Sequence, residues 1–552
     1  MLIRRKPPRP HGLNEPILHD GSHARPVSRR DFVAAGLMTG PAVVTATGLL
    51  GLMAARRAGA QTVPLTQDIS DLKAGCGIAA IGAGKIPFIC FDLAGGANLV
   101  GSEMLIGKQG GQLDFLTTAG YAKLGLPGDM VPNAPNAGSA TNNFINTAFG
   151  AAFHSDGAIL RGMLERTSAG TQALTNGCVI AARSENDTGN NPHNPMYGIY
   201  KAGADGQLLT LIGSQSSDSG GNSMAPAGLI DLSVRPTKVD RASDVTGLVD
   251  TGELARLMPQ ADAVAVLSSM VRLSGGTDVN GVSTNGKLGK IDIFSTVPEN
   301  DAIKETVRCG YVKSTDLAAR FGGPAALNPD LDPFIVDQSA TRGTAIFGQA
   351  EYQADGEFRK TAAVMKMVVN GYAGAGTITM GGYDYHDGTR ATGEMRNLRA
   401  GRCIGACLEY AARIGVPIMI YVFSDGSLSA TSMIDASVNG RGKFGWQGDN
   451  QSVAASFFLV YSPAGRPQAL TADAAGGLGK QIGYYRGDGS VETAGFPGAN
   501  AVNLLVETVL LNYMALHGEA LQFPNRFPGH GLGSQALRDS ITAFAPIVNG
   551  TI

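Results

Sequence analysis

The chain has 552 residues, of which 43% are hydrophobic and 16% are charged, and it contains 76 glycines. Residues 1–60 hold nine basic and three acidic side chains, so residues 61–552 carry 35 basic and 43 acidic side chains, a net charge of −8. An acidic body argues against nucleic acid as a partner, because phosphate backbones are bound by basic surfaces.

The first 60 residues have the pattern of a twin-arginine export signal. The pair Arg29-Arg30 precedes an uncharged stretch over residues 33–55, and small residues follow at 58–60. We expect cleavage after Ala60, recognition by the twin-arginine export machinery, and localisation in the periplasm or at the cell surface. The alternative is a retained membrane anchor, because the stretch is long enough to span a bilayer. Its glycine, alanine and threonine content makes it weakly apolar, so we expect no stable membrane span after cleavage.

Residues 61–552 are expected to form one α/β domain with a loop-rich cap near 185–260, where Gly, Ser and Asn are frequent. Three short apolar runs, at 86–91, 377–380 and 418–423, are each followed by turn residues. Such runs are typical of strands buried on both faces of a parallel sheet.

Helical spacing predicts helices at about 358–370, 390–414 and 502–517. The second of these lies between two predicted strands and makes a strand–helix–strand unit. The predicted fold is therefore a doubly wound, mainly parallel sheet sandwiched by helices.

Six cysteines follow the predicted signal, and an even number in an oxidising compartment permits disulfides without fixing their pairing. Cys403 and Cys407 share one face of a predicted helix, a poor geometry for a bridge to each other, so buried free thiols are expected there. The six are Cys76, Cys90, Cys178, Cys309, Cys403 and Cys407.

Three carboxylates, Asp92, Asp384 and Asp425, each follow a predicted buried strand, and His386 lies two residues beyond Asp384. In parallel sheets the carboxyl ends of the strands form the ligand crevice, so these side chains are expected to converge. They include the ligand types that divalent metals need. The alternative is ordinary turn or helix-cap chemistry, which explains any single aspartate.

Four features occur in one order: the leader, the segment 92–98, the segment 381–386 and the segment 423–425. Together they resemble a widespread bacterial family of exported proteins of unknown function, related to sulfatases and belonging to the alkaline phosphatase-like clan. The resemblance covers most of residues 80–470. It implies an alkaline phosphatase-like sheet, divalent metal at the strand ends, and hydrolysis of phosphate or sulfate esters.

By position, the resemblance matches Asp92 to the first-strand metal aspartate, and Asp384 and His386 to the first Asp/His ligand pair. With Asp425 and Asp449 these make the expected set around a divalent ion, Mg, Ca or Zn. Such an ion would activate a hydroxyl nucleophile and neutralise the ester oxygens.

Two departures from the family pattern weaken that expectation. A Gly-Arg-Thr turn is replaced by residues 426–428, Gly-Ser-Leu, and an Asp-His-Gly block is replaced by residues 449–451, Asp-Asn-Gln. Asn450 is a poor zinc ligand. The metal would then be Mg or Ca on carboxylates, or the site is vestigial.

The nucleophile is open between Ser102 and a hydroxyl of residues 214–221, such as Ser219; no Cys-x-Pro-x-Arg sulfatase motif is present. A chymotrypsin-like role for Ser219 is rejected, because His154 precedes it by only 65 residues. The polar segment 187–195 is expected either over the site or as an ordinary loop with a surface His193.

Two functions remain. The first is an exported metal-dependent hydrolase of a small-molecule phosphate or sulfate ester. The second is a non-catalytic exported protein that keeps the fold for binding, assembly or surface attachment.

Overall fold

The computed structural model describes residues 63–76, 84–133, 143–184, 191–248, 259–277, 283–284, 297–321, 324–337, 344–470 and 480–551. The predicted export signal lies outside these residues, and so do residues 185–190. No helix in the described ranges is long and apolar enough to cross a membrane.

The centre of the fold is a mixed, mostly parallel sheet of eight strands between helices. This confirms the α/β class. In spatial order the strands are β16 (Gln481–Ile482), β4 (Thr175–Ile180), β15 (Ser456–Tyr461), β12 (Ile418–Phe423), β1 (Phe88–Leu93), β11 (Ala373–Met380), β5 (Leu209–Gly213) and β6 (Thr237–Lys238).

The three strands predicted from apolar runs are neighbours, because β1 pairs in parallel with β11 on one side and with β12 on the other side. Every residue of these three strands is buried. Central strands with no solvent-facing side lose the alternating pattern of polar and apolar residues. The strand–helix–strand unit is confirmed, with β1 inserted between its two strands.

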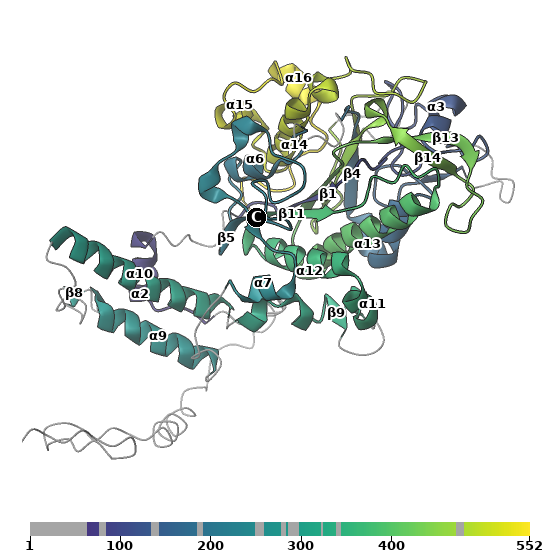
Figure 1. Cartoon of the computed structure of the whole chain (residues 1–552). Coiled ribbons are helices and arrows are strands. Elements are labelled where there is room, and N and C mark those ends of the chain that lie inside the picture. The colour runs from purple at the N-terminus through teal and green to yellow at the C-terminus, as the bar shows by residue number, and fades with distance from the viewer. Residues whose placement is uncertain are drawn as a thin grey trace, which may run out of the picture. The chain divides into compact units, whose positions relative to one another are not determined.

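Helices cover both faces of the sheet (Figure 1). On one face, α12 (Gly356–Val369) and α13 (Ala391–Ile414) pack on β11 and β12, and α4 (Ala158–Arg166) packs on α13. On the other, α6 (Met196–Lys201) packs on β11 beside α14 (Val502–Leu516). These positions confirm the predicted helices at 358–370, 390–414 and 502–517.

Strand β15 is the exception in the sheet, because it runs antiparallel to β12 and to β4. The segment predicted as a cap also differs in part. Its residues 209–213 and 237–238 are strands β5 and β6 of the main sheet. Between them, residues 214–236 form a long connection with only short 3₁₀ turns.

A separate group of helices consists of α2 (Gln67–Gly75), α9 (Gln260–Ser274) and α10 (Val297–Phe321). Its small apolar clusters are reinforced by a disulfide between Cys76 and Cys309, which closes 233 residues of chain. The sequence had left this pairing open. The other four cysteines are buried free thiols, as expected for Cys403 and Cys407.

Short two-stranded ribbons and helices complete the described chain. The ribbons are β2 (Ile145–Asn146) with β3 (Phe153–His154), β7 (Gly276–Thr277) with β8 (Ser283–Thr284), β9 (Val336–Asp337) with β10 (Phe347–Gly348), and β13 (Leu428–Ile434) with β14 (Phe444–Asp449). The helices are α3 (Thr118–Lys123), α5 (Ala169–Ala173), α7 (Ala242–Thr246), α11 (Gln349–Ala354), α15 (Phe523–Arg526) and α16 (Gln535–Ser540).

Candidate functional site

The predicted aspartates gather at one edge of the sheet because their three strands are parallel neighbours. Asp92 is the fifth residue of β1, while Asp384 and Asp425 follow β11 and β12. A fourth aspartate, Asp449, ends β14, and the next residue is tied to the same edge by the Asn450 N–H donating to Ser427 O at 2.8 Å. Four chain segments therefore supply carboxylates to one neighbourhood.

Asp92 is fully buried, and only one of its two carboxylate oxygens accepts hydrogen bonds within the described chain. Its Oδ2 accepts the N–H groups of Asn222 and Ser223 at 2.7 and 2.9 Å and the Thr379 hydroxyl at 3.2 Å. Its Oδ1 is hidden from solvent and has no hydrogen-bond partner in the described chain. Burial, helped by the nearby charge of Asp425, raises the pKa of Asp92 to about 7.

Asp425 is linked to Asp92 through a shared neighbour, Asn222. The Asn222 backbone N–H donates to Asp92, and its side-chain amide donates to Asp425 Oδ2 at 3.0 Å. The other oxygen of Asp425 accepts the Gly95 N–H at 2.7 Å. Burial raises the pKa of Asp425 above its usual range. Both inner carboxylates thus lie where a bound positive charge would be stabilised.

Gly95 brings the loop after β1 against the loop after β11. Its φ is +123°, and a Cβ at this position would lie 2.5 Å from the backbone nitrogen of Asp384. The approach is fixed by two backbone hydrogen bonds, Ala94 N–H to Met380 O and Tyr383 N–H to Ala94 O, both at 3.0 Å. A side chain at residue 95 would separate Asp384 from the inner carboxylates.

Asp384, His386 and Asp449 form an outer group whose ligand atoms all lie within 4.8 Å of one another. Asp384 Oδ1 and His386 Nε2 are 2.7 Å apart, and their side chains are 51% and 42% exposed. Two carboxylate oxygens and one imidazole nitrogen are a donor set for Mg²⁺, Ca²⁺ or Zn²⁺, and exposure leaves positions for water or substrate. The residues present fit a divalent ion.

Asn450, the residue after Asp449, is part of a local turn. Its Oδ1 accepts the N–H and the hydroxyl of Ser452 at 3.1 and 2.7 Å, capping the short 3₁₀ turn Gln451–Val453. The amide is a local turn residue here.

Ser102 lies in a different polar cluster. It is fully buried, and its Oγ accepts a hydrogen bond of 2.7 Å from Arg390 Nη2. Arg390 also stacks over the ring of Trp446 and pairs with Glu394 at 3.0 Å. The hydrogen bond of the Ser102 hydroxyl joins it to this ionic cluster rather than to the strand-end carboxylates.

Ser219 lies in the connection that covers Asp92, three residues before Asn222. It is 4% exposed, and its Oγ donates to Ser223 O at 2.7 Å. Gly221, two residues after Ser219, passes so close to Asp92 that a Cβ there would lie 2.9 Å from Asp92 Oδ2. Ser219 therefore shapes the loop that holds Asp92.

The described end of the polar segment, residues 191–195, lies against the same edge. The Asn191 side chain donates to the Asp425 carbonyl, and Ser223 Oγ donates to Asn191 O at 2.8 Å. His193 is only 2% exposed, stacks on Phe423, and has its Nε2 2.9 Å from Ser184 Oγ. The alternative of a surface histidine is wrong, and burial lowers the pKa of His193 to about 3.

Sequence reasoning missed the residues that hold Asp92 and Asp425, namely Asn222, Ser223, Thr379 and Asn191. Asn222 and Ser223 come from a segment whose composition indicates only loops. Thr379 belongs to the predicted strand 377–380 and Asn191 to the polar segment 187–195, and no spacing singles out either residue. The one local signal is the pair Gly220-Gly221, which permits the close passage beside Asp92.

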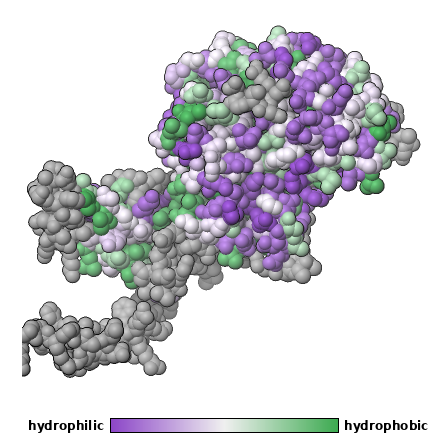
Figure 2. Space-filling view, in the orientation of Figure 1, coloured by the Kyte–Doolittle hydropathy of each residue, from purple (hydrophilic) through white to green (hydrophobic). Residues whose placement is uncertain are grey.

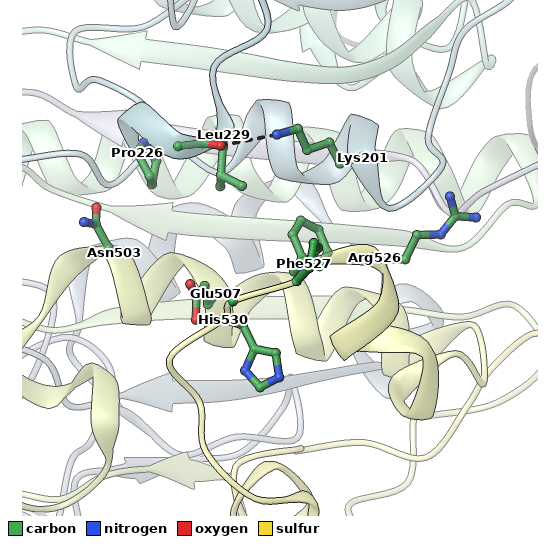
Figure 3. Close-up of a pocket in the computed structure, with 11 residues that line it drawn as sticks. Lys201, Pro226, Leu229, Asn503, Glu507, Arg526, Phe527 and His530 are labelled. Atoms are coloured by element: carbon green, nitrogen blue, oxygen red, sulfur yellow. Dashed lines mark hydrogen bonds between the residues drawn. The ribbon is translucent and has the colours of Figure 1, made fainter.

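A cavity of about 340 Å³ lies elsewhere, between α6 and the chain around α14 and α15 (Figure 3). Its charged residues are engaged separately: Lys201 donates to Gly228 O at 3.3 Å, and Glu507 accepts the Gly531 N–H at 2.8 Å. Figure 3 shows the charged ends of Lys201 and Arg526 and the ring of His530 pointing in different directions. The strand-end site has the more convergent chemistry.

No protein-family model, curated protein or solved structure matches this chain. Its function is therefore inferred from the strand-end geometry.

Proposed function

We propose that this protein is an exported hydrolase of phosphate or sulfate esters that depends on a divalent cation, with an alkaline phosphatase-like sheet. One observation carries the proposal. Asp384, His386 and Asp449 place three metal-ligating atoms within 4.8 Å of one another. Asp92, which lies outside this group of three, is buried and has an oxygen without a hydrogen-bond partner in the described part of the chain.

A divalent cation bound there would polarise the ester and neutralise its oxygens. The chain's own groups divide into two layers. Asp92 and Asp425 are held by amide donors, and a bound cation nearby would favour their charged forms. Asp384, His386 and Asp449 face solvent, where substrate enters. Because Ser102 and Ser219 have their hydroxyls engaged in other hydrogen bonds, the attacking oxygen in this proposal comes from water.

Export is supported by two independent features. The twin-arginine pattern at residues 1–60 is the first. The second is the Cys76–Cys309 disulfide, since such bonds persist in oxidising compartments and are rare in the cytosol.

A second function, binding without catalysis, is favoured by two observations. Asn222 supplies a backbone donor to Asp92 and a side-chain donor to Asp425, so protein amides already satisfy part of the charge that a cation would neutralise. The replacement of the family's second histidine by Asn450 points the same way.

The test is the metal content of the exported protein, measured by mass spectrometry. We expect about one divalent ion per chain in the wild type, retention in Asp129→Ala, an exposed aspartate elsewhere, and loss in Asp384→Ala/His386→Ala. Asp92→Asn is a third variant. Its amide oxygen can still accept the two backbone N–H groups, so the fold is kept while the inner negative charge is removed.

If the wild type and all variants are folded and contain no metal, the hydrolase proposal fails and the binding function is the better account. If metal is present and is lost only from the site variants, phosphate and sulfate monoesters are the substrates to screen.

A further inference from the structure

A row of three arginines lines a groove on α13 beside the strand-end site. The groove has a volume of about 460 Å³ and lies along the exposed side of the helix next to the start of α12. Figure 2 shows mainly hydrophilic surface over the part of the molecule where Figure 1 draws α12 and α13. The lining residues are Asp355, Thr392, Met395, Arg396, Arg399 and Arg402.

The guanidinium groups in this groove are only partly neutralised by acids. Arg402 is paired with Glu165 of α4 at 2.6 Å. Arg399 Nη1 is 4.0 Å from Asp355 Oδ1, and that oxygen already accepts the Glu357 N–H at 2.8 Å as the cap of α12. The carboxylate that faces Arg399 is therefore distant, and it also serves as the cap of α12.

Arg396 has no acidic partner among the described residues and is bonded to a carbonyl instead. Its Nη1 donates to Gly381 O at 3.3 Å. The Nε atoms of Arg396 and Arg399 are both hidden from solvent and have no hydrogen-bond partner in the described part of the chain. A ligand in the groove would therefore meet the terminal nitrogens of these two guanidinium groups, which have no close carboxylate.

The groove adjoins the loop after β11, which carries two of the proposed metal ligands. Gly382 has a φ of +85°, and a Cβ there would overlap Arg396 Nη1, so the guanidinium rests directly on the Gly381-Gly382 backbone. Asp384 follows two residues later. At the other side, Thr392 Oγ1 donates to Asp387 Oδ2 at 3.0 Å, which ties α13 to the loop that carries His386.

The chemistry of the groove selects anions with more than one charged group. A guanidinium presents a planar fork of donors that matches phosphate, sulfate and carboxylate oxygens. Arg396, Arg399 and Arg402 recur every three residues, so at 1.5 Å per residue the row extends about 9 Å along the helix. That length exceeds one anionic group and suits two.

We propose that the α13 groove is a subsite for a second anionic group of the substrate, so that the ester cleaved at the strand ends belongs to a polyanionic phosphate or sulfate compound. This inference rests on the proposed function for the identity of the reacting ester. The binding of the anion to the groove does not require the metal.

The experiment is calorimetric titration of the full chain, freed of metal by a chelator that is then dialysed away, with sodium tripolyphosphate and with orthophosphate. We expect the wild type to bind tripolyphosphate at least about tenfold more tightly than orthophosphate. The variant Arg396→Gln/Arg399→Gln should lose about tenfold or more, because it removes two charge-assisted contacts. The control Arg486→Gln, an arginine 53% exposed outside the groove, should bind within twofold of the wild type.

The variant Asp384→Ala/His386→Ala separates this inference from the proposed function. It should bind tripolyphosphate as tightly as the wild type or more tightly, because it removes a negative charge beside the groove. The subsite is refuted if the wild type does not bind tripolyphosphate, or if the groove variant keeps wild-type affinity while its circular dichroism spectrum is unchanged. Failure of the metal test with a positive titration would refute the hydrolase alone.

Discussion

Individual buried polar residues in this protein are held in one protonation state by their hydrogen bonds. His517 is 1% exposed. Its Nε2 accepts the Ile86 N–H at 2.9 Å, and its Nδ1 is 2.8 Å from Tyr513 O, to which it donates. The ring therefore needs one unprotonated and one protonated nitrogen, which is the neutral form of histidine. It joins the start of β1 to the end of α14.

This pairing predicts a loss of stability in mild acid. Burial lowers the pKa of His517 to about 4, whereas an unfolded histidine titrates near 6.5. As pH falls from about 6.5 to 4, the unfolded chain takes up a proton that the folded chain refuses, so the free energy of unfolding decreases. At pH 5 the loss from this residue is about 2 kcal/mol.

Urea unfolding of the wild type and of His517→Gln, at pH 7.5 and pH 5.0, checks this prediction. Glutamine cannot be protonated, so the variant should lose less stability between the two pH values, although it is less stable at pH 7.5. Since His154 and His193 are also buried, the difference between the two proteins is the quantity to compare. Equal losses in both proteins would refute the assignment.

The site aspartates could be predicted from the sequence at this scale, but their partners could not. Asp92, Asp384 and Asp425 stand out because each follows an apolar run and the fold places three such runs together. Asn222 and Ser223 are about 130 residues from Asp92 and lie in a segment without periodicity. Only the tertiary path of residues 214–225 brings them to the carboxylate.

At the scale of elements, the turn after β11 is the point where strand, helix and site meet. Gly382 and Gly388 both adopt positive φ, +85° and +83°. A Cβ at Gly382 would meet Arg396, whereas a Cβ at Gly388 would have nothing within 4 Å. The two glycines impose the same backbone requirement in different surroundings.

Alanine substitutions at these two glycines should separate the cost of backbone strain from the effect of displacing the Arg396 side chain. Gly382→Ala and Gly388→Ala should each cost about 1–2 kcal/mol of stability, because alanine resists positive φ. Only Gly382→Ala should displace Arg396 and weaken tripolyphosphate binding, measured by calorimetry beside the wild type. Equal binding by both variants would show that the placement of Arg396 over Gly382 does not matter for anions.

Strand orientation is the element-scale feature that the sequence did not reveal. The apolar run of β15 has the composition of a buried strand in either direction, so its antiparallel course depends on the connection before it. That connection contains the β13–β14 ribbon, and Asp449 is the last residue of β14. Because β15 is reversed, its start lies at the edge where β12 ends, and Asp449 lies beside Asp384.

For the whole molecule, α/β class could be predicted because buried central strands and amphipathic helices leave strong patterns. The small helical group of α2, α9 and α10 leaves a weaker one, with few buried apolar residues in its clusters. Its cross-link joins residues 233 positions apart, and cysteine counting alone could not pair them.

This cross-link predicts a redox-dependent stability. Cys76→Ser/Cys309→Ser should be less stable by about 2–4 kcal/mol, because the unfolded chain regains the freedom that the closed loop removes. Thermal unfolding followed by circular dichroism should show a lower midpoint for the variant. Dithiothreitol should lower the wild-type midpoint to that of the variant and leave the variant unchanged. A wild-type midpoint insensitive to dithiothreitol would contradict a stabilising disulfide.

The position of Cys76 has a mechanical consequence. The disulfide attaches the chain to α10 before it reaches β1, so tension on the first 75 residues is delivered to Cys309 through a covalent bond. Strand β1 with Asp92 lies within the closed ring of residues 76–309, whereas β11, β12 and the aspartates after them come later in the chain. A pull on the chain ahead of Cys76 would therefore load the helical group first, and the hydrogen bonds of β1 would be shielded from that force.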